Sequence, residues 1–330
     1  MAVQNKDSYR DNPLLKKVGV QHNYTKEQIE EYMKCAEDPI YFCVNYIKIV
    51  NVDEGLVKFK MWDFQKDMIN LFKDNRFVIT KCPRQVGKTT TTVAYMLWMS
   101  IFHNEQNIAI LANKGQNARD ILGKYQLAYE NLPQWLQQGV IEWNKGSFEL
   151  ENGSRVLAAA TSSNNIRGYS INLLIIDEAA FIDGWDQFFT SVFPTISSGA
   201  STKLVLISTV NGLNHFYKIT SLARQEKNNY KLISVPWQKV PNRDEKWKEE
   251  TLAAMNFDYD RFAQEYENQY LGSSGTLIAG WKLQELVPQT PIAEHAGICQ
   301  YSKPKINRTY VGIADVSRGK GLDYSALQVF

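Results

Sequence analysis

Residues 77–90 read FVITKCPRQVGKTT, which is a short apolar run, a polar loop and the opening of a longer apolar segment. The run that ends at Thr80 predicts a buried strand, and the segment from Lys88 to about Phe102 predicts a helix. A loop in this setting, closed by Gly-Lys-Thr, is typical of a phosphate-binding loop. Its backbone N–H groups and the N-terminus of the helix would face a polyphosphate. Cys82 stands where the usual pattern has its first glycine.

The side chains of this loop suggest separate tasks. Lys88 would reach the β- and γ-phosphates of a nucleotide, and Thr89 would offer its hydroxyl to Mg²⁺. Arg84 is unusual in such a loop, and its guanidinium would stabilise transition-state charge, bond a neighbour or lie in solvent. The alternative is an incidental Gly-Lys-Thr at the start of a helix. The nucleotide-binding residues expected from the motif are Arg84, Gln85, Val86, Gly87, Lys88, Thr89 and Thr90.

A second apolar run, Leu173 to Ile176, predicts a strand that ends in the adjacent carboxylates Asp177 and Glu178. A carboxylate at a strand tip can hold the Mg²⁺ shell, and the next one can orient the attacking water. Two acids that cap the following helix are the alternative interpretation. The two motifs stand in the required order, about 90 residues apart. Together they favour a site that hydrolyses a nucleotide.

Three polar residues near these motifs carry weaker signals. Gln65 precedes the loop strand by about a dozen residues, where translocating ATPases place a glutamine that reads adenine. Ser208 and Thr209 end another apolar strand, where a hydroxyl would face the γ-phosphate. Taken alone, the first is a surface glutamine and the other two are a strand end.

Between residues 65 and 208 the pattern alternates strand, loop and helix. Its strands are apolar without polar alternation, as strands buried on both faces are. This predicts a mainly parallel α/β sheet with helices on both sides and a nucleotide at the carboxyl ends of its strands. We expect the strand ending at Thr80 to lie centrally, beside those ending near Ile176 and Ser208. Asn152-Gly153 predicts a hairpin turn.

The flanking segments are organised differently. The first two dozen residues are polar and aperiodic, which predicts a loose arm. Thr25 and Gln28 predict a capped helix, and Pro39 the start of another. After about Pro236 the pattern is mainly helical. Residues 309–330 predict a strand, a glycine turn and the start of a second strand, so we expect the sequence to be part of a longer protein.

Composition excludes several classes of protein. Hydrophobic residues make up 44% and charged residues 22% of the chain, as in a globular protein, and no apolar run is long enough to span a membrane or form a secretory signal. The four cysteines and four histidines lack zinc-ligand spacing. A net charge of +2 does not indicate nucleic-acid binding, so any DNA contact would be a local patch or would lie outside this segment.

The motifs together resemble a known family, the large terminase subunits of tailed bacteriophages, specifically the myovirus branch. The resemblance covers roughly residues 60–330, in family order. Its segments are FQKDM, CPRQVGKTT, TSSNNIRGYSINLLIIDEAAFID, STVNGLNHFYKI, SSGTLIAGWKL and GIADVSRGKGLDYSAL. The resemblance implies a P-loop NTPase fold of the RecA/ASCE type. A departing first glycine is normal in that family, so Cys82 fits the pattern.

The resemblance also implies roles for individual residues. Gln65 would contact adenine, and Arg84 and Lys88 would act with the catalytic base Glu178. Thr89 and Asp177 would hold Mg²⁺ beside bound ATP. A coupling motif that relays phosphate release would consist of Ser208, Thr209 and Asn211. Arg167 lies in another shared segment, with a less definite role.

The family's C-terminal domain is an RNase H-like nuclease that uses Mg²⁺ or Mn²⁺. Asp315 is similar to its first metal-binding acid, and Asp323 is a weaker second candidate. The other acids would lie beyond Phe330, so endonuclease activity is expected only in a longer chain. The resemblance implies four divisions of the chain. They are an N-terminal arm with helices (residues 1–60), the ATPase core (61–235), a helical subdomain with linker (236–275), and the hinge with the first nuclease strands (276–330).

By the same resemblance the protein would couple ATP hydrolysis to the translocation of double-stranded DNA into a phage procapsid. Its partners would be DNA, the portal protein, the small terminase subunit and further copies of itself in a ring, without a membrane. It would act in the host cytoplasm, transiently docked on the portal, and be absent from the mature virion. A superfamily-2-like helicase and a non-hydrolysing nucleotide-binding scaffold are the alternatives.

Overall fold

The computed structural model describes residues 7–161, 166, 170–197, 199–270, 290–295, 298–316 and 326–330. The chain forms two compact units, residues 1–280 and 281–330, which are described separately. The expected boundary between residues 275 and 276 falls outside the described residues, so the domain limits stay predictions.

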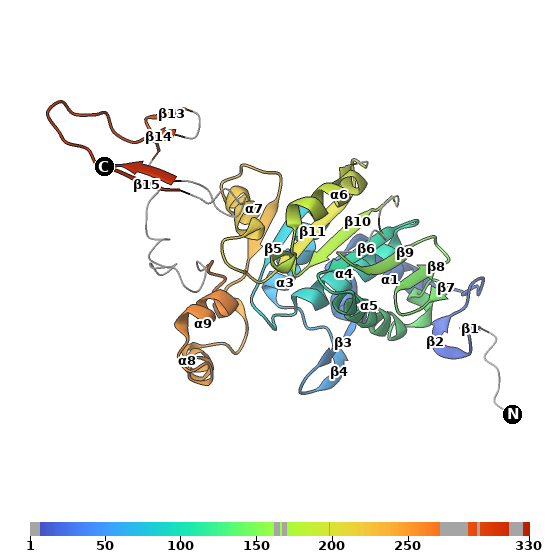
Figure 1. Cartoon of the computed structure of the whole chain (residues 1–330). Coiled ribbons are helices and arrows are strands. Elements are labelled where there is room, and N and C mark those ends of the chain that lie inside the picture. Colours follow the sequence, from blue (N-terminus) through green and yellow to red (C-terminus); the bar gives the residue numbers. More distant parts are fainter. Residues whose placement is uncertain are drawn as a thin grey trace. The chain divides into compact units, whose positions relative to one another are not determined.

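An eight-stranded sheet forms the centre of the first unit (Figure 1). Six neighbouring strands are parallel, and the last two are antiparallel additions at one edge. The predicted mainly parallel sheet is therefore confirmed. In spatial order the strands are β12 (Lys231–Ser234), β5 (Phe77–Lys81), β11 (Lys203–Ser208), β10 (Leu173–Asp177), β6 (Asn107–Ala112), β9 (Arg155–Ala160), β8 (Ser147–Leu150) and β7 (Val140–Trp143).

The expected position of β5 beside β11 is confirmed, but its expected central place and its expected place beside β10 are wrong. β5 does pair with β11, but its other neighbour is β12, and β10 lies beyond β11. The strand that leads into the candidate phosphate loop is thus second from an edge. Strand order depends on where each helical crossover returns the chain, and the apolar pattern of a strand does not contain that information. The short strand β12 was not predicted at all.

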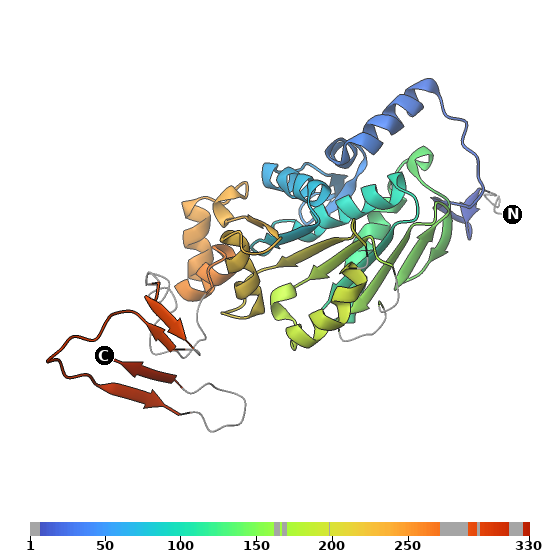
Figure 2. The same cartoon turned by 90° about the horizontal axis from the view of Figure 1, so that it is seen from above.

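Helices cover both faces of the sheet (Figure 2). One face carries α3 (Asp63–Asp74), α4 (Lys88–Phe102) and α5 (Gly115–Glu130), and the other carries α6 (Trp185–Ser197) and α7 (His215–Arg224). Successive side chains of a strand point to opposite faces. In β10, Ile175 packs in the first core while Leu174 and Ile176 pack in the second. This double burial explains why the strands lack polar alternation.

The segment before the sheet contains the two predicted helices, α1 (Lys26–Glu37) and α2 (Pro39–Tyr46). The capping box is present: the Gln28 backbone N–H donates to Thr25, and the Thr25 backbone N–H donates to the Gln28 side chain. A hairpin of β3 (Lys48–Asn51) and β4 (Gly55–Lys58) follows. The predicted hairpin between β8 and β9 is also confirmed, with Gly153 in its turn at φ +78°.

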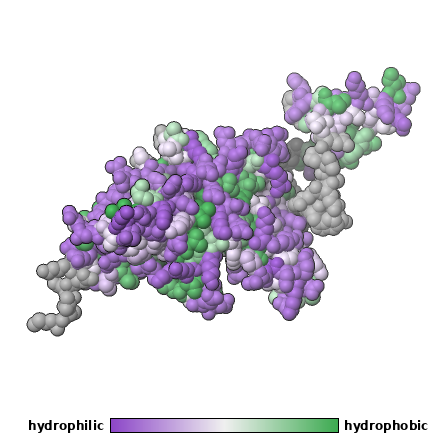
Figure 3. All heavy atoms as spheres, turned by 180° about the vertical axis from the view of Figure 1, so that it is seen from behind, coloured by the Kyte–Doolittle hydropathy of each residue, from purple (hydrophilic) through white to green (hydrophobic). Residues whose placement is uncertain are grey.

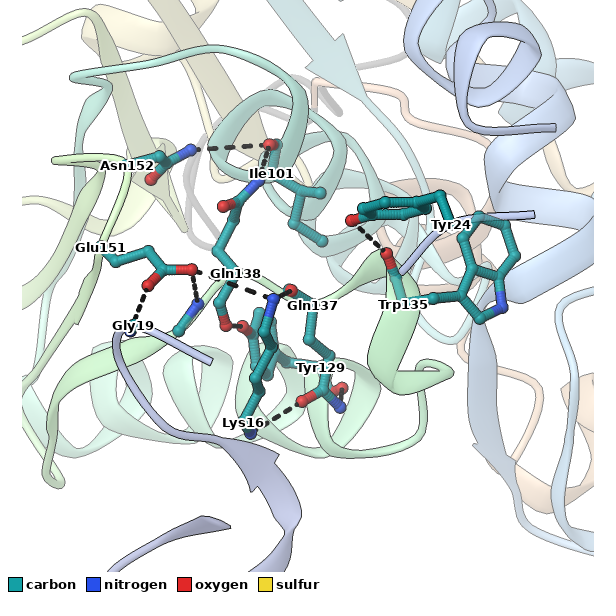
Figure 4. Close-up of polar contacts among 11 residues, drawn as sticks. Lys16, Gly19, Tyr24, Ile101, Tyr129, Trp135, Gln137, Gln138, Glu151 and Asn152 are labelled. Carbon is teal, nitrogen blue, oxygen red and sulfur yellow. Dashed lines mark hydrogen bonds and ion pairs between the residues drawn. The ribbon is translucent and has the colours of Figure 1, made fainter. Parts of the chain in front are cut away.

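The described part of the first two dozen residues is not a loose arm, contrary to the sequence prediction. β1 (Ser8–Tyr9) and β2 (Asn12–Lys16) form a hairpin against the 3-10 turn η1 (Gln134–Leu136). Buried Gln137 organises the contact shown in Figure 4, because it accepts from the Lys16 backbone N–H at 3.1 Å and donates to carbonyls on both sides. Glu151 likewise accepts from Gly19 at 3.0 Å. These partners lie more than a hundred residues away, so local sequence does not reveal them.

The predicted helical segment after the sheet contains the turn η3 (Trp237–Lys239), α8 (Glu245–Ala254) and α9 (Tyr259–Tyr266). It has a small core of its own, while Val240 packs in the first of the two cores beside the sheet. The small core is mainly aromatic and contains Trp237, Leu252 and Phe262, with Trp247, Met255 and Tyr266 packed against them. We call residues 237–266 the helical subdomain.

The described part of the second unit consists of two antiparallel pairs, β13 (Ala293–His295) with β14 (Ile298–Gln300), and β15 (Gly312–Asp315) with β16 (Ala326–Val329). The pairing of β15 with β16 confirms the hairpin expected at residues 309–330. The RNase H-like character of this unit stays a prediction. Hydrophilic residues cover most of the visible face in Figure 3. None of the described helices has the length and hydropathy needed to cross a membrane.

Candidate nucleotide site

The loop between β5 and α4 has the backbone of a tight cradle. Gln85 and Gly87 both adopt left-handed conformations, with φ of +58° and +70°. The Cys82 N–H donates to the carbonyl of Ser208 at 3.2 Å, which ties the start of the loop to the end of the neighbouring strand β11. A Cβ on Gly87 would lie 2.6 Å from Gln65 Nε2, so this glycine is required both by its φ and by close packing.

Gln65 holds this loop from the start of α3. Its side chain is 3% exposed, and its Nε2 donates to the Val86 carbonyl at 3.1 Å. Its Oε1 accepts from the Trp62 N–H at 2.9 Å, which closes the N-terminus of α3. Both ends of the amide are therefore bonded within the protein. These contacts position the loop, and the expected adenine contact stays a prediction.

Lys88 begins α4 and lies beside the loop, with Nζ 3.5 Å from the Pro83 carbonyl oxygen. Burial lowers the pKa of Lys88, while the nearby carboxylates of Asp177 and Glu178 act in the opposite direction. The two sequence motifs are thus brought together at the carboxyl ends of β5 and β10. The half-buried Thr89 and Thr90 follow in the first turn of the helix.

Asp177 ends β10 and is only 8% exposed. Its Oδ1 is buried without a hydrogen-bond partner among the described residues. Burial raises the pKa of this carboxyl, and the charge of Lys88 lowers it. An unpartnered buried carboxylate oxygen suits a hard divalent cation, so Asp177 fits a Mg²⁺ site.

The described residues contain no cluster of three or more potential metal ligands from histidine, cysteine, aspartate and glutamate. Mg²⁺ commonly binds through one or two protein oxygens together with phosphate and water. A site made of Asp177 and the Thr89 hydroxyl would therefore be completed by the nucleotide itself.

Glu178 follows in a left-handed conformation with φ of +52°. Its Oε2 accepts from Asn117 Nδ2 at 3.1 Å, and the same amide nitrogen donates to Asn113 Oδ1 at 3.1 Å. Asn117 lies in α5, the helix that follows β6, and β6 is the neighbour of β10. We did not identify Asn117 from the sequence. The sequence does contain a signal for Asn117, because it is a polar residue at the start of the helix that follows β6, the strand next to β10.

The expected coupling residues contact the turn that follows Glu178. Ser208 Oγ accepts from the Ala180 N–H at 3.1 Å, and Asn211 Nδ2 donates to the Ala180 carbonyl at 3.3 Å. Two residues absent from the prediction strengthen this link. Asn214 Nδ2 donates to the same carbonyl at 2.6 Å, and His215 Nε2 lies 2.7 Å from the Ala179 carbonyl oxygen. The 3-10 turn η2 (Ala179–Phe181) is therefore fastened to the start of α7.

A cavity of about 720 Å³ lies along this turn, lined by residues 180–187, Asn211, Asn214 and His215. Thr209 is buried at 5% exposure beside Ser208. Burial lowers the pKa of His215. Its ring stacks on Trp185, with ring centroids 4.6 Å apart.

Arg84 points to the helical subdomain. Its Nε donates to Glu265 Oε2 at 2.7 Å, while Arg243 donates to the carbonyls of Arg84 and Gln85 at 3.2 and 3.3 Å. Neither Glu265 nor Arg243 was expected from the sequence, because both are distant charged residues on an otherwise ordinary helical segment.

The remaining predicted residues are not part of this assembly as described. Arg167 and Asp323 lie outside the described residues. Asp315 is exposed at the end of β15 in the second unit, and its proposed metal role stays a prediction.

The family model that matches this chain and the related proteins named below belong to one family. The model for the terminase large subunit, T4-like-virus type, N-terminal part, matches residues 79–285. The terminase large subunit of Escherichia phage T5 is 29% identical over 224 residues, 64% of this chain and 48% of that protein. That of Thermus phage G20c is 25% identical over 186 residues, 52% of this chain and 36% of that protein. The chain thus spans half or less of the length of these relatives.

Solved structures show the same fold. The large terminase of bacteriophage HK97 has a TM-score of 0.61 at 18% identity, over 86% of this chain and 62% of that one. A mutant ATPase domain of the large terminase of Thermus phage P74-26 has a TM-score of 0.55 at 17% identity, over 64% of this chain and 95% of that domain.

Proposed function

Since this chain belongs to the T4-like-virus type of terminase large subunits, we propose that it is the ATPase motor that drives double-stranded DNA into a phage procapsid. One observation carries the proposal. Lys88, Asp177 and Glu178 meet at the carboxyl ends of a parallel sheet, where α/β proteins bind ligands.

The residues divide the chemistry among them. Backbone N–H groups of the loop and Lys88 bind the phosphates of ATP. Asp177 and Thr89 would hold Mg²⁺, which when bound supplies charge neutralisation at the transferring phosphoryl group. Glu178, oriented by Asn117, accepts the proton of the attacking water.

The contacts around η2 suggest how hydrolysis is transmitted. Glu178 immediately precedes this turn, and Ser208, Asn211, Asn214 and His215 all bond to it. A change at Glu178 on phosphate release therefore reaches α7 through hydrogen bonds to two backbone residues. Gln65 would contribute by holding the loop, with an adenine contact as its further proposed role.

The wider setting follows from the family. We propose DNA, the portal protein, the small terminase subunit and further copies of this chain in a ring as partners, in the host cytoplasm while docked on the portal. Cutting of concatemeric DNA, with Asp315 as a metal ligand, is proposed for a longer chain only. A helicase-like translocase is the second candidate, and the non-hydrolysing scaffold is a third that retention of Lys88 and Glu178 disfavours.

The decisive experiment measures ATP binding and hydrolysis by the unaltered chain, Lys88→Ala and Glu178→Gln. We expect Lys88→Ala to lose binding and hydrolysis together. Glu178→Gln should bind ATP and retain it unhydrolysed, because the variant keeps the shape of the side chain and loses the base. Hydrolysis at the parental rate by Glu178→Gln would show that another residue is the base. Binding without any hydrolysis by the unaltered chain would favour the scaffold, and strand separation would favour the helicase.

A further inference from the structure

The segment around α7 carries an excess of positive charge. Residues 214–231, which run from the N-cap of α7 to the start of β12, contain four lysine or arginine side chains and one acid, Glu226. The whole chain has a net charge of only +2. All four basic side chains are exposed, and they are Lys218, Arg224, Lys227 and Lys231. The excess is therefore local and lies on the surface.

These cations have no acid partner within the part of the chain that the structure describes. None of the ion pairs found there involves any of the four side chains. Lysines on α1 differ, because Lys26 and Lys34 lie 3.9 and 3.6 Å from the carboxylates of Glu30 and Glu31. The charge around α7 is thus available to an external anion.

The exposed side of α7 has the composition of a phosphate contact. Tyr217, Lys218, Arg224 and Gln225 are exposed and fall within about a third of the circumference of the helix. The opposite side packs on the second core and the edge strand β12 (Figure 1). Lysine, arginine, tyrosine and glutamine side chains are donors that bind phosphate oxygens in complexes with nucleic acids. α7 itself contains no acid.

The surface continues into the loop after the helix. The Lys227 N–H donates to the Leu222 carbonyl at 2.8 Å, so this lysine is held against the end of α7. We call the following six exposed residues the α7 face: Tyr217, Lys218, Arg224, Gln225, Lys227 and Lys231.

The spread of the α7 face indicates a polyanion. From Lys218 to Arg224 the helix alone rises about 9 Å, and two further cations follow in the loop and at the start of β12. A single phosphate does not reach groups so far apart. Duplex DNA carries one negative charge per about 1.7 Å of its axis, so several cations of the face contact phosphates together.

α7 is also fastened to the turn that follows Glu178. Asn214 Oδ1 accepts from the N–H groups of Phe216 and Tyr217 at 2.9 and 3.4 Å, while its Nδ2 donates to the Ala180 carbonyl at 2.6 Å. One side chain thus caps the helix and bonds the turn η2. A ligand on the α7 face is held by the helix that contacts the nucleotide site.

We propose, on the basis of the function proposed above, that the α7 face binds the phosphate backbone of double-stranded DNA. Binding is independent of base sequence, because phosphate contacts position a duplex without reading it. Since Asn214 joins α7 to η2, DNA on this face is linked to the state of the nucleotide site.

The test measures binding of a short fluorescein-labelled duplex by fluorescence anisotropy. It compares Lys218→Gln/Lys227→Gln with the control Lys26→Gln/Lys34→Gln, which removes the same charge from lysines that have acid partners. The logarithm of the binding constant falls with the logarithm of salt by about 0.9 per phosphate contact. Loss of two contacts should therefore weaken binding roughly 10- to 60-fold in about 0.1 M salt and reduce the slope by about 2. The control should stay within about twofold of the parent, because charges far from the DNA are screened.

A second measurement tests the link to hydrolysis. The duplex should raise the ATPase turnover of the unaltered chain and of the control, and raise it much less in Lys218→Gln/Lys227→Gln. Without DNA all three should hydrolyse ATP alike, because neither lysine of the α7 face belongs to the nucleotide site. An equal response to DNA in all three would overturn the link. Thermal unfolding verifies that the variants are folded.

Parental affinity and salt slope in folded Lys218→Gln/Lys227→Gln, or an equal loss in the control, would overturn the DNA contact. Absence of duplex binding by the unaltered chain, or a strong preference between two duplexes of unrelated sequence, would overturn it as well. Tighter binding of polyglutamate than of the duplex would assign the face to an acidic protein instead. Failure of the unaltered chain to hydrolyse ATP would overturn the proposed function, and because DNA binding is measured directly, the two failures are distinguishable.

Discussion

Replacing Gln65 by leucine tests whether this side chain positions the phosphate loop or contacts the adenine base. Leucine has a similar volume but no amide, so Val86 loses a buried donor and Trp62 loses its cap acceptor. Leaving a buried polar group unpaired costs about 1–3 kcal/mol. With a cap contribution of up to ~1 kcal/mol, we expect a loss of roughly 2–4 kcal/mol in the free energy of unfolding.

The assay combines urea denaturation with the binding of ATP and GTP. Loosening the loop should weaken both nucleotides alike, because the loop contacts phosphates and not bases. Gln28→Leu is the matched control. Gln28 has the same cap geometry in α1, where it is half-buried beside His22 and has no bond to the phosphate loop, and its loss should cost at most about 1 kcal/mol.

One pair of results would refute this reasoning. If Gln65→Leu weakened ATP but not GTP, and left the free energy of unfolding within about 0.5 kcal/mol of the parent, Gln65 would act as an adenine reader and the loop contact would be incidental.

Three further predictions concern other buried or charged groups. Burial lowers the pKa of Lys81 to about 8, below its ordinary 10.5. Between these two pH values the unfolded chain binds more protons than the folded chain, so the free energy of unfolding of the parent, relative to that of Lys81→Met, should rise from pH 8 to 10.5 by up to about 3 kcal/mol. A difference in denaturation midpoints that stays constant with pH would contradict this prediction. Arg84→Ala should lower turnover far more than ATP affinity, because the charge of Arg84 matters most as transition-state charge develops. If steady-state and binding assays showed equal losses, Arg84 would instead be a ligand of the ground-state phosphate. Gln137→Leu should lower the free energy of unfolding by about 2–4 kcal/mol, because it removes the hydrogen-bond partner of several buried groups. The control Gln134→Leu, at an exposed position, should lower it by less than about 1 kcal/mol. Equal denaturation curves for the two variants would count against the N-terminal attachment.

The sequence by itself determined the elements whose causes are local. The apolar runs before Cys82 and Asp177 predicted buried strands of a parallel sheet, and the glycine and lysine at residues 87 and 88 predicted a phosphate-binding loop that opens a helix. The capping box of Thr25 followed from residue types three positions apart. Motif order alone placed Lys88 near the acids, since parallel strands present their carboxyl ends at one edge of the sheet.

Tertiary structure alone decided what depends on distant partners. The position of β5 beside β12 follows from the path of the crossovers, and the hairpin at residues 8–16 is held by a glutamine more than a hundred positions away. Asn117 and Glu265 are ordinary polar residues on ordinary helices until folding brings them to Glu178 and Arg84. A single hydrogen bond or ion pair leaves no periodic trace in a sequence, whereas burial of a whole face does, and for that reason the strands were predictable and these contacts were not.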